Sequence, residues 1–440
     1  MFTTFRNAWK MEDLRKKLLY TLFILVIFRL GSAIPVPFMA AEGISALVGA
    51  SGNGMMGYLD MLTGGAFSKS TLFALSVGPY INASIIVQLL TVAIPALERM
   101  AKEGEEGRRK INKITRYVGC GIGVALSIAY YFLLRSYGVL SYTTGFAGVF
   151  SAIVIICTYA AGAMLIIWLG EQIDVKGIGN GISLLIFAGI VSRFPEVFTT
   201  VQTMWTKAVG SGNGTGEAKY FFFIPLLAVL ALAVIVFIVI LTNAERRIPV
   251  QYAKRVVGRK QYGGQSTHIP MKVNMSGVMP VIFASAMVSI PSTILAFMPQ
   301  SVLANPNWFV KFLTAFNYDK AMYAVIYLLL IIAFNYFYVA IQYNPIEIAN
   351  NLRKNNGAVP GIRPGKPTSD FISKALGKIT FIGAIFLAVV AIMPIGLSKV
   401  IGMNISLGGT SLLIVVGVAL DVSRQLESYM LMRHHKGFLE

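Results

Sequence analysis

The sequence predicts an all-α polytopic membrane protein with ten transmembrane helices in two similar halves. Three observations lead to this fold class. The 440 residues are 56% hydrophobic and only 13% charged, whereas soluble proteins carry about 25% charged residues. Apolar segments of membrane-spanning length recur along the whole chain, and one short pattern occurs once in each half. These features exclude a set of soluble domains and indicate an internal duplication.

Ten apolar segments reach, or nearly reach, the roughly 20 residues that a helix needs to cross a bilayer. The fifth and tenth are short and contain polar residues, so we expect them in the protein interior, because lipid would not shelter those residues. We therefore expect an N-terminal half at residues 1–200 and a C-terminal half at 201–440, each ending on a short helix. The segments are 18–37, 71–94, 115–134, 148–169, 178–193, 220–242, 276–298, 321–341, 379–395 and 407–421.

The repeated pattern opens the second and the seventh apolar segments. Residues 77–87 read VGPYINASIIV and residues 278–288 read VMPVIFASAMV, which share the frame V-x-P-x-I-x-A-S-x-x-V. Proline is tolerated at the start of a helix, and small Ala-Ser pairs let helices approach closely. Duplicated membrane proteins tend to place their working surface between the halves. The alternative is two unrelated helices that share common membrane residues.

The charge distribution predicts that both termini are cytosolic. If the N-terminus is cytosolic and ten helices alternate in direction, most of the 38 Lys and Arg residues fall in cytosolic segments. This is the bias that the positive-inside rule describes.

Two long basic loops, at residues 243–275 and 344–378, are expected on the cytosolic side. Loops of this length that also contain Pro and Gly usually carry function, and a basic projection suits an acidic protein or the phosphate backbone of RNA. The alternative is ordinary positive-inside charge that binds anionic lipid headgroups. The candidate docking residues are Lys254, Arg255, Arg259, Lys260, Arg353, Lys354, Arg363 and Lys366.

One external segment is too short to span the membrane and too apolar for a solvated loop. Residues 51–66 read SGNGMMGYLDMLTGGA, with glycines at both ends. This pattern predicts either a short helix on flexible hinges that sits in a cavity, or a re-entrant turn at the membrane interface.

The sequence lacks the motifs of an ATPase, a metalloprotease or a serine hydrolase. Few ionisable residues fall within the expected spans, namely Arg29 and, near span ends, Arg135, Glu171 and Asp421. Coupled carriers usually bury carboxylates or histidines near the midplane, so a passive pore is favoured over the alternative, an inverted-repeat secondary transporter. We expect no enzymatic activity, no cofactor and no metal.

Six stretches of the chain, in order, resemble the SecY family of channel subunits of the bacterial Sec protein translocon, which is related to Sec61 alpha. Several of these stretches exceed ten residues, and together they extend over nearly the whole chain. They are residues 73–92 (FALSVGPYINASIIVQLLTV), 102–117 (KEGEEGRRKINKITRY), 168–191 (WLGEQIDVKGIGNGISLLIFAGIV), 246–284 with the core QSTHIPMKVN, 360–367 (PGIRPGKP) and 408–415 (GGTSLLIV).

The resemblance implies two pseudo-symmetric, inverted five-helix halves around a central pore that opens laterally between the second and seventh helices. Matched motif to motif, an apolar pore ring falls on Val77, Ile81, Ile182, Ile186, Ile282 and Ile414. We expect Asn82 and Gln88, opposite Ile290, to line the lateral gate, because polar side chains facing lipid are costly. The family's plug corresponds to about residues 54–69, with Met55, Met56, Tyr58, Leu59, Met61 and Leu62 as its apolar residues.

The resemblance also implies a location and a set of partners. The location is the bacterial plasma (inner) membrane, and the cargo is unfolded secretory polypeptide, whose signal sequences and transmembrane segments leave laterally into the lipid. The implied partners are the SecE and SecG subunits, the motor ATPase SecA, the ribosome, signal peptides and nascent chains, and anionic membrane lipids.

Overall fold

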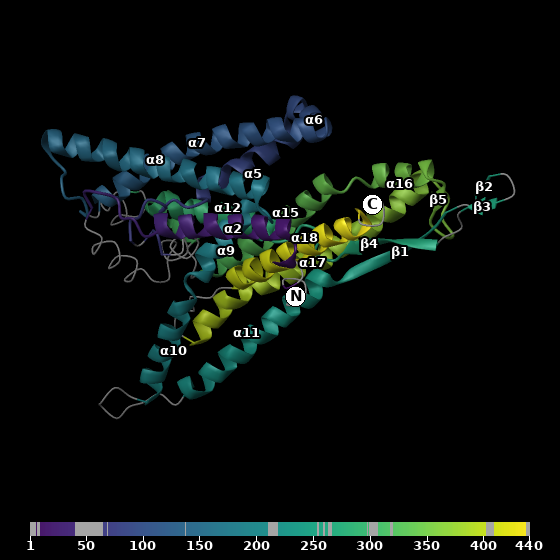
Figure 1. The fold of residues 1–440 in the computed structure, drawn as a ribbon. Helices are drawn as coiled ribbons and strands as arrows, with labels where there is room; N and C mark the ends of the chain where they lie inside the picture. Colours follow the sequence, from purple (N-terminus) through teal and green to yellow (C-terminus); the bar gives the residue numbers. More distant parts are fainter. Residues whose placement is uncertain are drawn as a thin grey trace.

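Long helices dominate the structure, a computed structural model, and a small β-sheet projects from one end of the helical body (Figure 1). The structure describes residues 6, 9–39, 65–67, 69–136, 138–209, 219–252, 255–257, 260–262, 266–296, 298, 307–316, 320–401 and 409–436.

The described helices of the first half run from α2 to α10. Helix α7 packs against both α5 and α8, and Gly119 of α7 faces Ala83 of α5, where an added Cβ would make ordinary van der Waals contact at 3.6 Å. The helices are α2 (Glu12–Gly31), α5 (Gly78–Ala93), α6 (Pro95–Lys102), α7 (Glu105–Ser136), α8 (Gly145–Lys176), α9 (Gly181–Val191) and α10 (Phe194–Val209).

The chain turns by 104° between α5 and α6. The turn falls at Ile94, the residue before Pro95, whose backbone is extended (φ −107°, ψ 114°). A residue that precedes proline is disfavoured in the helical region because its own backbone and Cβ clash with the proline ring. Helix α6 therefore begins in a new direction instead of continuing α5.

The second half alternates long helices with shorter helices and strands. The helices are α11 (Lys219–Asn243), α12 (Met279–Ala296), α14 (Trp308–Thr314), α15 (Ala321–Gln342), α16 (Pro345–Lys354), α17 (Lys366–Ile401) and α18 (Gly409–Lys436). The strands are β1 (Glu245–Tyr252), β2 (Arg255–Val257), β3 (Lys260–Tyr262), β4 (Ser266–Lys272) and β5 (Gly357–Ala358).

The two long basic segments are largely structured and not open loops. Strands β4, β1 and β5 form an antiparallel sheet, in which Ile248 pairs with Ile269, and β2 pairs with β3 further along the same hairpin. Ile248, Val250 and Met271 pack against Ile372 and other buried residues of α17. The β1–β4 hairpin therefore stands on a hydrophobic base that continues into a membrane helix.

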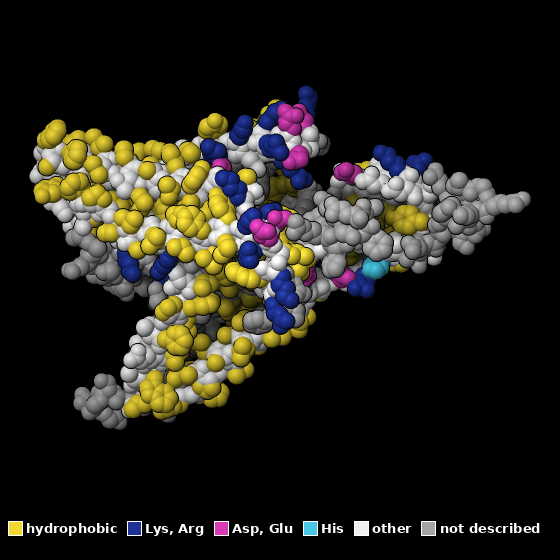
Figure 2. Space-filling view, in the orientation of Figure 1, with side chains coloured by type: hydrophobic (Ala, Val, Ile, Leu, Met, Phe, Trp, Pro, Cys, Tyr) yellow, Lys and Arg dark blue, Asp and Glu magenta, His cyan; other side chains and the backbone are white. Residues whose placement is uncertain are grey.

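Each of the ten predicted apolar segments contains a helix: α2, α5, α7, α8, α9, α11, α12, α15, α17 and α18. Among the described residues, five helices are long and apolar enough to cross a membrane by themselves, and α5 with α6 makes a bent sixth. The short α9 is buried along most of its length, which confirms that it is an interior helix. Charged side chains gather toward the end that carries α6 and the sheet, and hydrophobic ones cover the body (Figure 2).

The repeated frame occupies equivalent structural positions in its two copies. Val77 and Val278 directly precede α5 and α12, and each helix has its proline as the second residue. Ala83 and Ala284 at the matching positions are both fully buried. Four of the six frame positions are buried in both copies, as duplication predicts when each copy faces similar neighbours, whereas the Ile and Ser positions are more buried in the second copy. Helix α10 runs through position 200, where the sequence predicts the division between the halves.

Candidate functional site

A partly open pocket lies between helices of the two halves. None of the described residues that line it is ionisable. They are Leu75, Ser76, Val77, Gly78, Ile81, Asn82, Ile186, Val281, Ile282, Ser285, Ala286, Ser289, Thr410 and Ile414. The walls come from the start of α5, from α9, from α12 and from the start of α18, and thus include both copies of the repeated frame.

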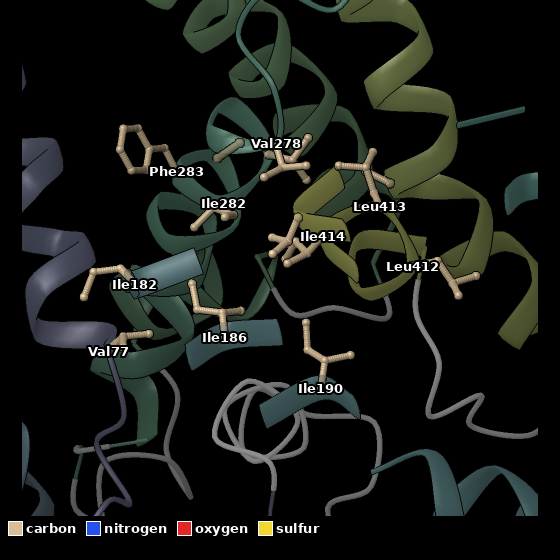
Figure 3. Packing of buried hydrophobic residues seen from close by; sticks show 14 of the residues in the cluster. Val77, Ile182, Ile186, Ile190, Val278, Ile282, Phe283, Leu412, Leu413 and Ile414 are labelled. Atoms are coloured by element: carbon tan, nitrogen blue, oxygen red, sulfur yellow. The ribbon is translucent and has the colours of Figure 1, made fainter. Parts of the chain in front are cut away.

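Five of the six predicted pore-ring residues line this pocket: Val77, Ile81, Ile186, Ile282 and Ile414. All but Ile81 are buried, with exposed fractions of 8% or less, and Ile81 packs against the same hydrophobic cluster. Figure 3 shows the side chains of Ile186, Ile282 and Ile414 converging from three helices. Aliphatic side chains that meet in this way exclude water from a constriction.

The sixth predicted residue, Ile182, belongs to the same cluster but does not line the pocket. It packs toward α8, where a Cβ added at Gly170 would lie 2.6 Å from Ile182 Cδ1. Ile186 is one helical turn further along α9, so the two side chains lie on one face. Ile182 therefore continues the same apolar face of α9 beyond the pocket, against α8.

The start of α9 is held by three hydrogen bonds to backbone N–H groups. Asn180 Oδ1 accepts from the N–H of Ser183 at 3.0 Å, and Asp174 Oδ1 accepts from the N–H of Gly181 at 2.7 Å. Gln425 Oε1 accepts from the N–H of Gly179 at 2.8 Å. Helix N-termini leave such donors without intrahelical partners, and these side chains satisfy them. The pocket-lining residue of α9, Ile186, thus follows a fixed helix start.

Several polar residues of the pocket were not predicted from the sequence. Ser285 Oγ donates to the carbonyl of Ile282 at 2.7 Å, and Ser289 Oγ donates to the carbonyl of Ala286 at 2.7 Å. Serine hydroxyls in helices often bond their own helix in this way. Each hydroxyl proton is thus bonded within α12, which orients the serine side chain, while its oxygen can still accept a hydrogen bond.

The three predicted lateral-gate residues lie in different surroundings. Asn82 lines the pocket opposite Ser285 and Ser289 of α12. Gln88 Oε1 accepts a hydrogen bond from Tyr338 Oη of α15 at 2.9 Å. Ile290 is 47% exposed and is not among the pocket residues. The bond from Tyr338 joins α5 of the first half to α15 of the second, and no sequence signal had indicated this tyrosine.

Removing the hydroxyl of Tyr338 should loosen the contact between the halves. Interhelical hydrogen bonds in membranes contribute about 0.6 kcal/mol on average and up to about 1.7. We expect Tyr338→Phe to speed the separation of α5 from α15 severalfold. The rate is measured as the change in bimane fluorescence from a label on α5. Tyr336→Phe is the matched control, since Tyr336 Oη donates to the carbonyl of Gly377 within the second half. Equal effects of both variants would contradict a specific role for Tyr338.

All six predicted plug residues lie outside the described residues, as does most of the predicted plug range. At its C-terminal edge, Phe67 is described and buried, and its carbonyl accepts a hydrogen bond from Tyr130 Oη of α7 at 3.2 Å. Pro35 and Thr71 form an antiparallel bridge nearby. Residues 65–67 are therefore part of the packed N-terminal half.

The predicted docking residues that the structure describes lie on β2, β3, α16 and the segment from Arg363 to the start of α17. Arg255 begins β2 and Lys260 begins β3, whereas Lys254 and Arg259 lie outside the described residues. Arg353 and Lys354 end α16 and are exposed, as are Arg363 and Lys366.

The turn that carries Arg363 is held at both ends. Gly361 and Gly365 have φ angles of 82° and 107°, which favour glycine, and the carbonyl of Arg363 accepts from Thr368 Oγ1 at 2.8 Å. Ile362 packs into the hydrophobic base under the sheet. The guanidinium of Arg363 is thus presented from a fixed backbone.

Comparison with known proteins identifies the family. The SecY family model matches residues 71–423. The chain is 41% identical to the protein translocase subunit SecY of Thermotoga maritima over 447 aligned positions, covering 100% of this chain and 98% of that protein. It is 42% identical to the SecY subunit of Halalkalibacterium halodurans, with full coverage of both.

Solved structures give the same fold. A structure described as a protein-conducting channel superimposes with a TM-score of 0.60 at 20% identity, covering 94% of this chain and 92% of that one. Sec61 from a canine ribosome–channel complex superimposes with a TM-score of 0.56 at 19% identity, over the same shares of the two chains. With the family model matched over most of the chain and relatives aligned from end to end, the chain belongs to the SecY family.

Proposed function

We propose that this chain is a protein-conducting channel that moves unfolded secretory polypeptides across a membrane and releases apolar segments sideways into the lipid. The observation that carries the proposal is the aliphatic pocket between the halves of a SecY-family chain. A passive aliphatic constriction can seal against ions and still deform around a varied polymer. The absence of ionisable residues among the described lining residues favours this channel over the alternative, a coupled transporter.

The direct test is transport by the purified chain. We expect proteoliposomes that contain the chain with SecE and SecG to protect a secretory precursor from external protease when SecA and ATP are added. The precursor without its signal sequence is the control. A chain that fails to transport the precursor but exchanges a small solute against an ion gradient would support the transporter instead.

The cytosolic surface is proposed to dock the partners that drive transport. Solved relatives include Sec61 and Ssh1 in complexes with ribosomes, which supports ribosome binding here. The basic hairpin and the Arg363 turn project beyond the helical body, as docking surfaces for SecA or the ribosome would. We further propose the bacterial plasma membrane as the location, with both termini cytosolic, in agreement with the positive-inside bias.

The lateral gate is proposed to open between α5 and α12, with Asn82 on one side and Ser289 on the other. Since both residues line the pocket and Ile290 does not, Ser289 is a better position than Ile290 for a crosslink. In a chain with Cys120 and Cys157 replaced by alanine, we expect the Asn82→Cys and Ser289→Cys pair to form a disulfide that blocks lateral release. Reduction of this disulfide should restore lateral release. Both cysteines reacting with maleimide while no disulfide forms in any state would contradict this gate.

A further inference from the structure

The cytosolic end of α18 binds the end of α11, where the basic hairpin begins. Arg424 Nη2 donates to the carbonyl of Thr242 at 2.8 Å and to Asn243 Oδ1 at 2.7 Å. Thr242 and Asn243 are the last two residues of α11, and the last carbonyls of a helix lack intrahelical partners. Strand β1 starts two residues later, at Glu245. Arg424 therefore holds the point from which the hairpin leaves the membrane helix.

The returning strand of the hairpin ends close to the same guanidinium. Lys272, the last residue of β4, pairs with Glu245 across the hairpin. Burial lowers the pKa of Lys272, and the positive charge of Arg424 lowers it further. Lys272 thus lies near enough to Arg424 for their charges to interact, while Arg424 itself bonds the end of α11 from which β1 departs.

The next residues of α18 contact the first half of the molecule instead. Gln425 Oε1 accepts from the N–H of Gly179, in the turn between α8 and α9. Leu426 is fully buried, in a cluster with Leu14 of α2 and Ile178 of the same turn. Successive helical residues are about 100° apart around the axis, so neighbouring positions face opposite halves.

The turn that receives these contacts sets the position of α9. Gly179 has a φ angle of 92°, and a Cβ added there would lie 3.2 Å from Val422 Cγ2 of α18. A Cβ at Gly181 would lie 2.0 Å from the carbonyl oxygen of Gly170, so α9 starts wedged between α8 and α18. Ile186 of the pocket follows within two turns of this start.

We propose that the cytosolic end of α18 is a tie that couples the position of the β1–β4 hairpin to that of the pocket helix α9. Arg424 is the positioning residue on the hairpin side, and Leu426 is the positioning residue on the α9 side. A partner that displaces the hairpin pulls α18 through Arg424, and α18 moves the α8–α9 turn. The roles of hairpin and pocket rest on the proposed function, whereas the tie itself is a property of the fold.

The tie can be measured without any partner. Spin labels at Thr267→Cys on β4 and Val175→Cys at the end of α8, both exposed positions, report the distance between the hairpin and the turn. The background chain carries alanine at Cys120 and Cys157. We expect a narrow distance distribution in the parent, and a shifted and broadened one in Arg424→Met and in Leu426→Ala.

The variant that carries both Arg424→Met and Leu426→Ala gives the decisive measurement. Because the two contacts act in series, cutting both should broaden the distribution no further than cutting one. Leu426→Met keeps the buried volume and should keep the parent distribution. Lys16→Met, which removes an exposed ion pair with Glu12 on α2, is the control. An unchanged distribution in both single variants, or a broader one in the double variant, overturns the tie. If Arg424→Met does not fold, Arg424→Lys, which lacks the planar fork, replaces it.

A second arm separates this inference from the proposed function. At saturating SecA, we expect precursor transport by Arg424→Met and Leu426→Ala to fall severalfold while SecA affinity stays at the parent value. Reduced SecA affinity in Arg424→Met would mean that this residue shapes the docking surface, which overturns its role in coupling. A parent chain that SecA does not drive at all overturns the proposed docking role, while the spin-label distances still decide the tie.

Discussion

Replacing Ile81, Ile282 and Ile414 together with serine should make the closed channel leak ions. These three side chains come from α5, α12 and α18 and line one pocket. Serine in their place removes apolar surface and adds hydroxyls that can hold water in the constriction. Lowering the free-energy barrier to ion passage by about 1.4 kcal/mol raises the rate of passage tenfold. We therefore expect at least a tenfold rise in resting conductance, measured in planar bilayers.

The matched control keeps the apolar volume. Substitution of the same three positions by leucine conserves size and hydrophobicity, which cores tolerate, and it should leave the resting conductance near the parent value. The serine variant should also export precursors with defective signal sequences, because a weaker seal is easier to open. Parent-like conductance of the serine variant, with the protein folded and inserted, would show that the pocket is not the permeability barrier.

Changing Arg363 should reduce partner-driven transport more than any other single change on the cytosolic surface. Its guanidinium is exposed on a turn fixed by Gly361, Gly365 and the bond from Thr368. A planar fork held in this way can bind a carboxylate or phosphate in a bidentate manner, which a lysine cannot reproduce. Hydrogen bonds to charged groups contribute about 1.5–3 kcal/mol, so we expect roughly a 10- to 100-fold loss of SecA affinity in Arg363→Glu and a smaller loss in Arg363→Lys.

The Arg363 variants need a control that makes the same change in net charge at another position. Lys374 is exposed on α17 in the same cytosolic region, and Lys374→Glu makes the same change in net charge away from the turn. If Arg363 only contributes to the positive-inside bias, both glutamate variants should behave alike and Arg363→Lys should be fully active. Precursor export and SecA binding, measured on the same preparations, distinguish the two interpretations.

Much of the fold was predictable from the sequence because membrane-spanning helices consist mostly of apolar residues. Each predicted apolar segment contains a helix, and the duplicated frame marks the start of two helices at equivalent positions. Most of the predicted ring could be located because these residues fall within the repeat or within long motifs. The division of the chain at position 200 stays a prediction, and α10 is continuous across that position.

The partners of individual side chains were not predictable. Tyr338 is an ordinary residue of an apolar helix until the fold places it against Gln88. Nothing in the sequence distinguishes Arg424 from the other arginines of the chain. Only the fold places its guanidinium at the end of α11. The serines of α12 look polar in sequence, yet their hydroxyls bond their own helix.

The sequence by itself determined the membrane class, the helical segments, the duplication and the SecY-family motifs, because each depends on residue type and order along the chain. Only the tertiary structure decided which side chains meet. It placed Ile186, Ile282 and Ile414 around one pocket, left Ile182 outside that pocket and Ile290 exposed, and built a sheet from the basic segments. Those outcomes depend on contacts between residues far apart in the chain, whose geometry is fixed by how whole helices pack and not by any local pattern.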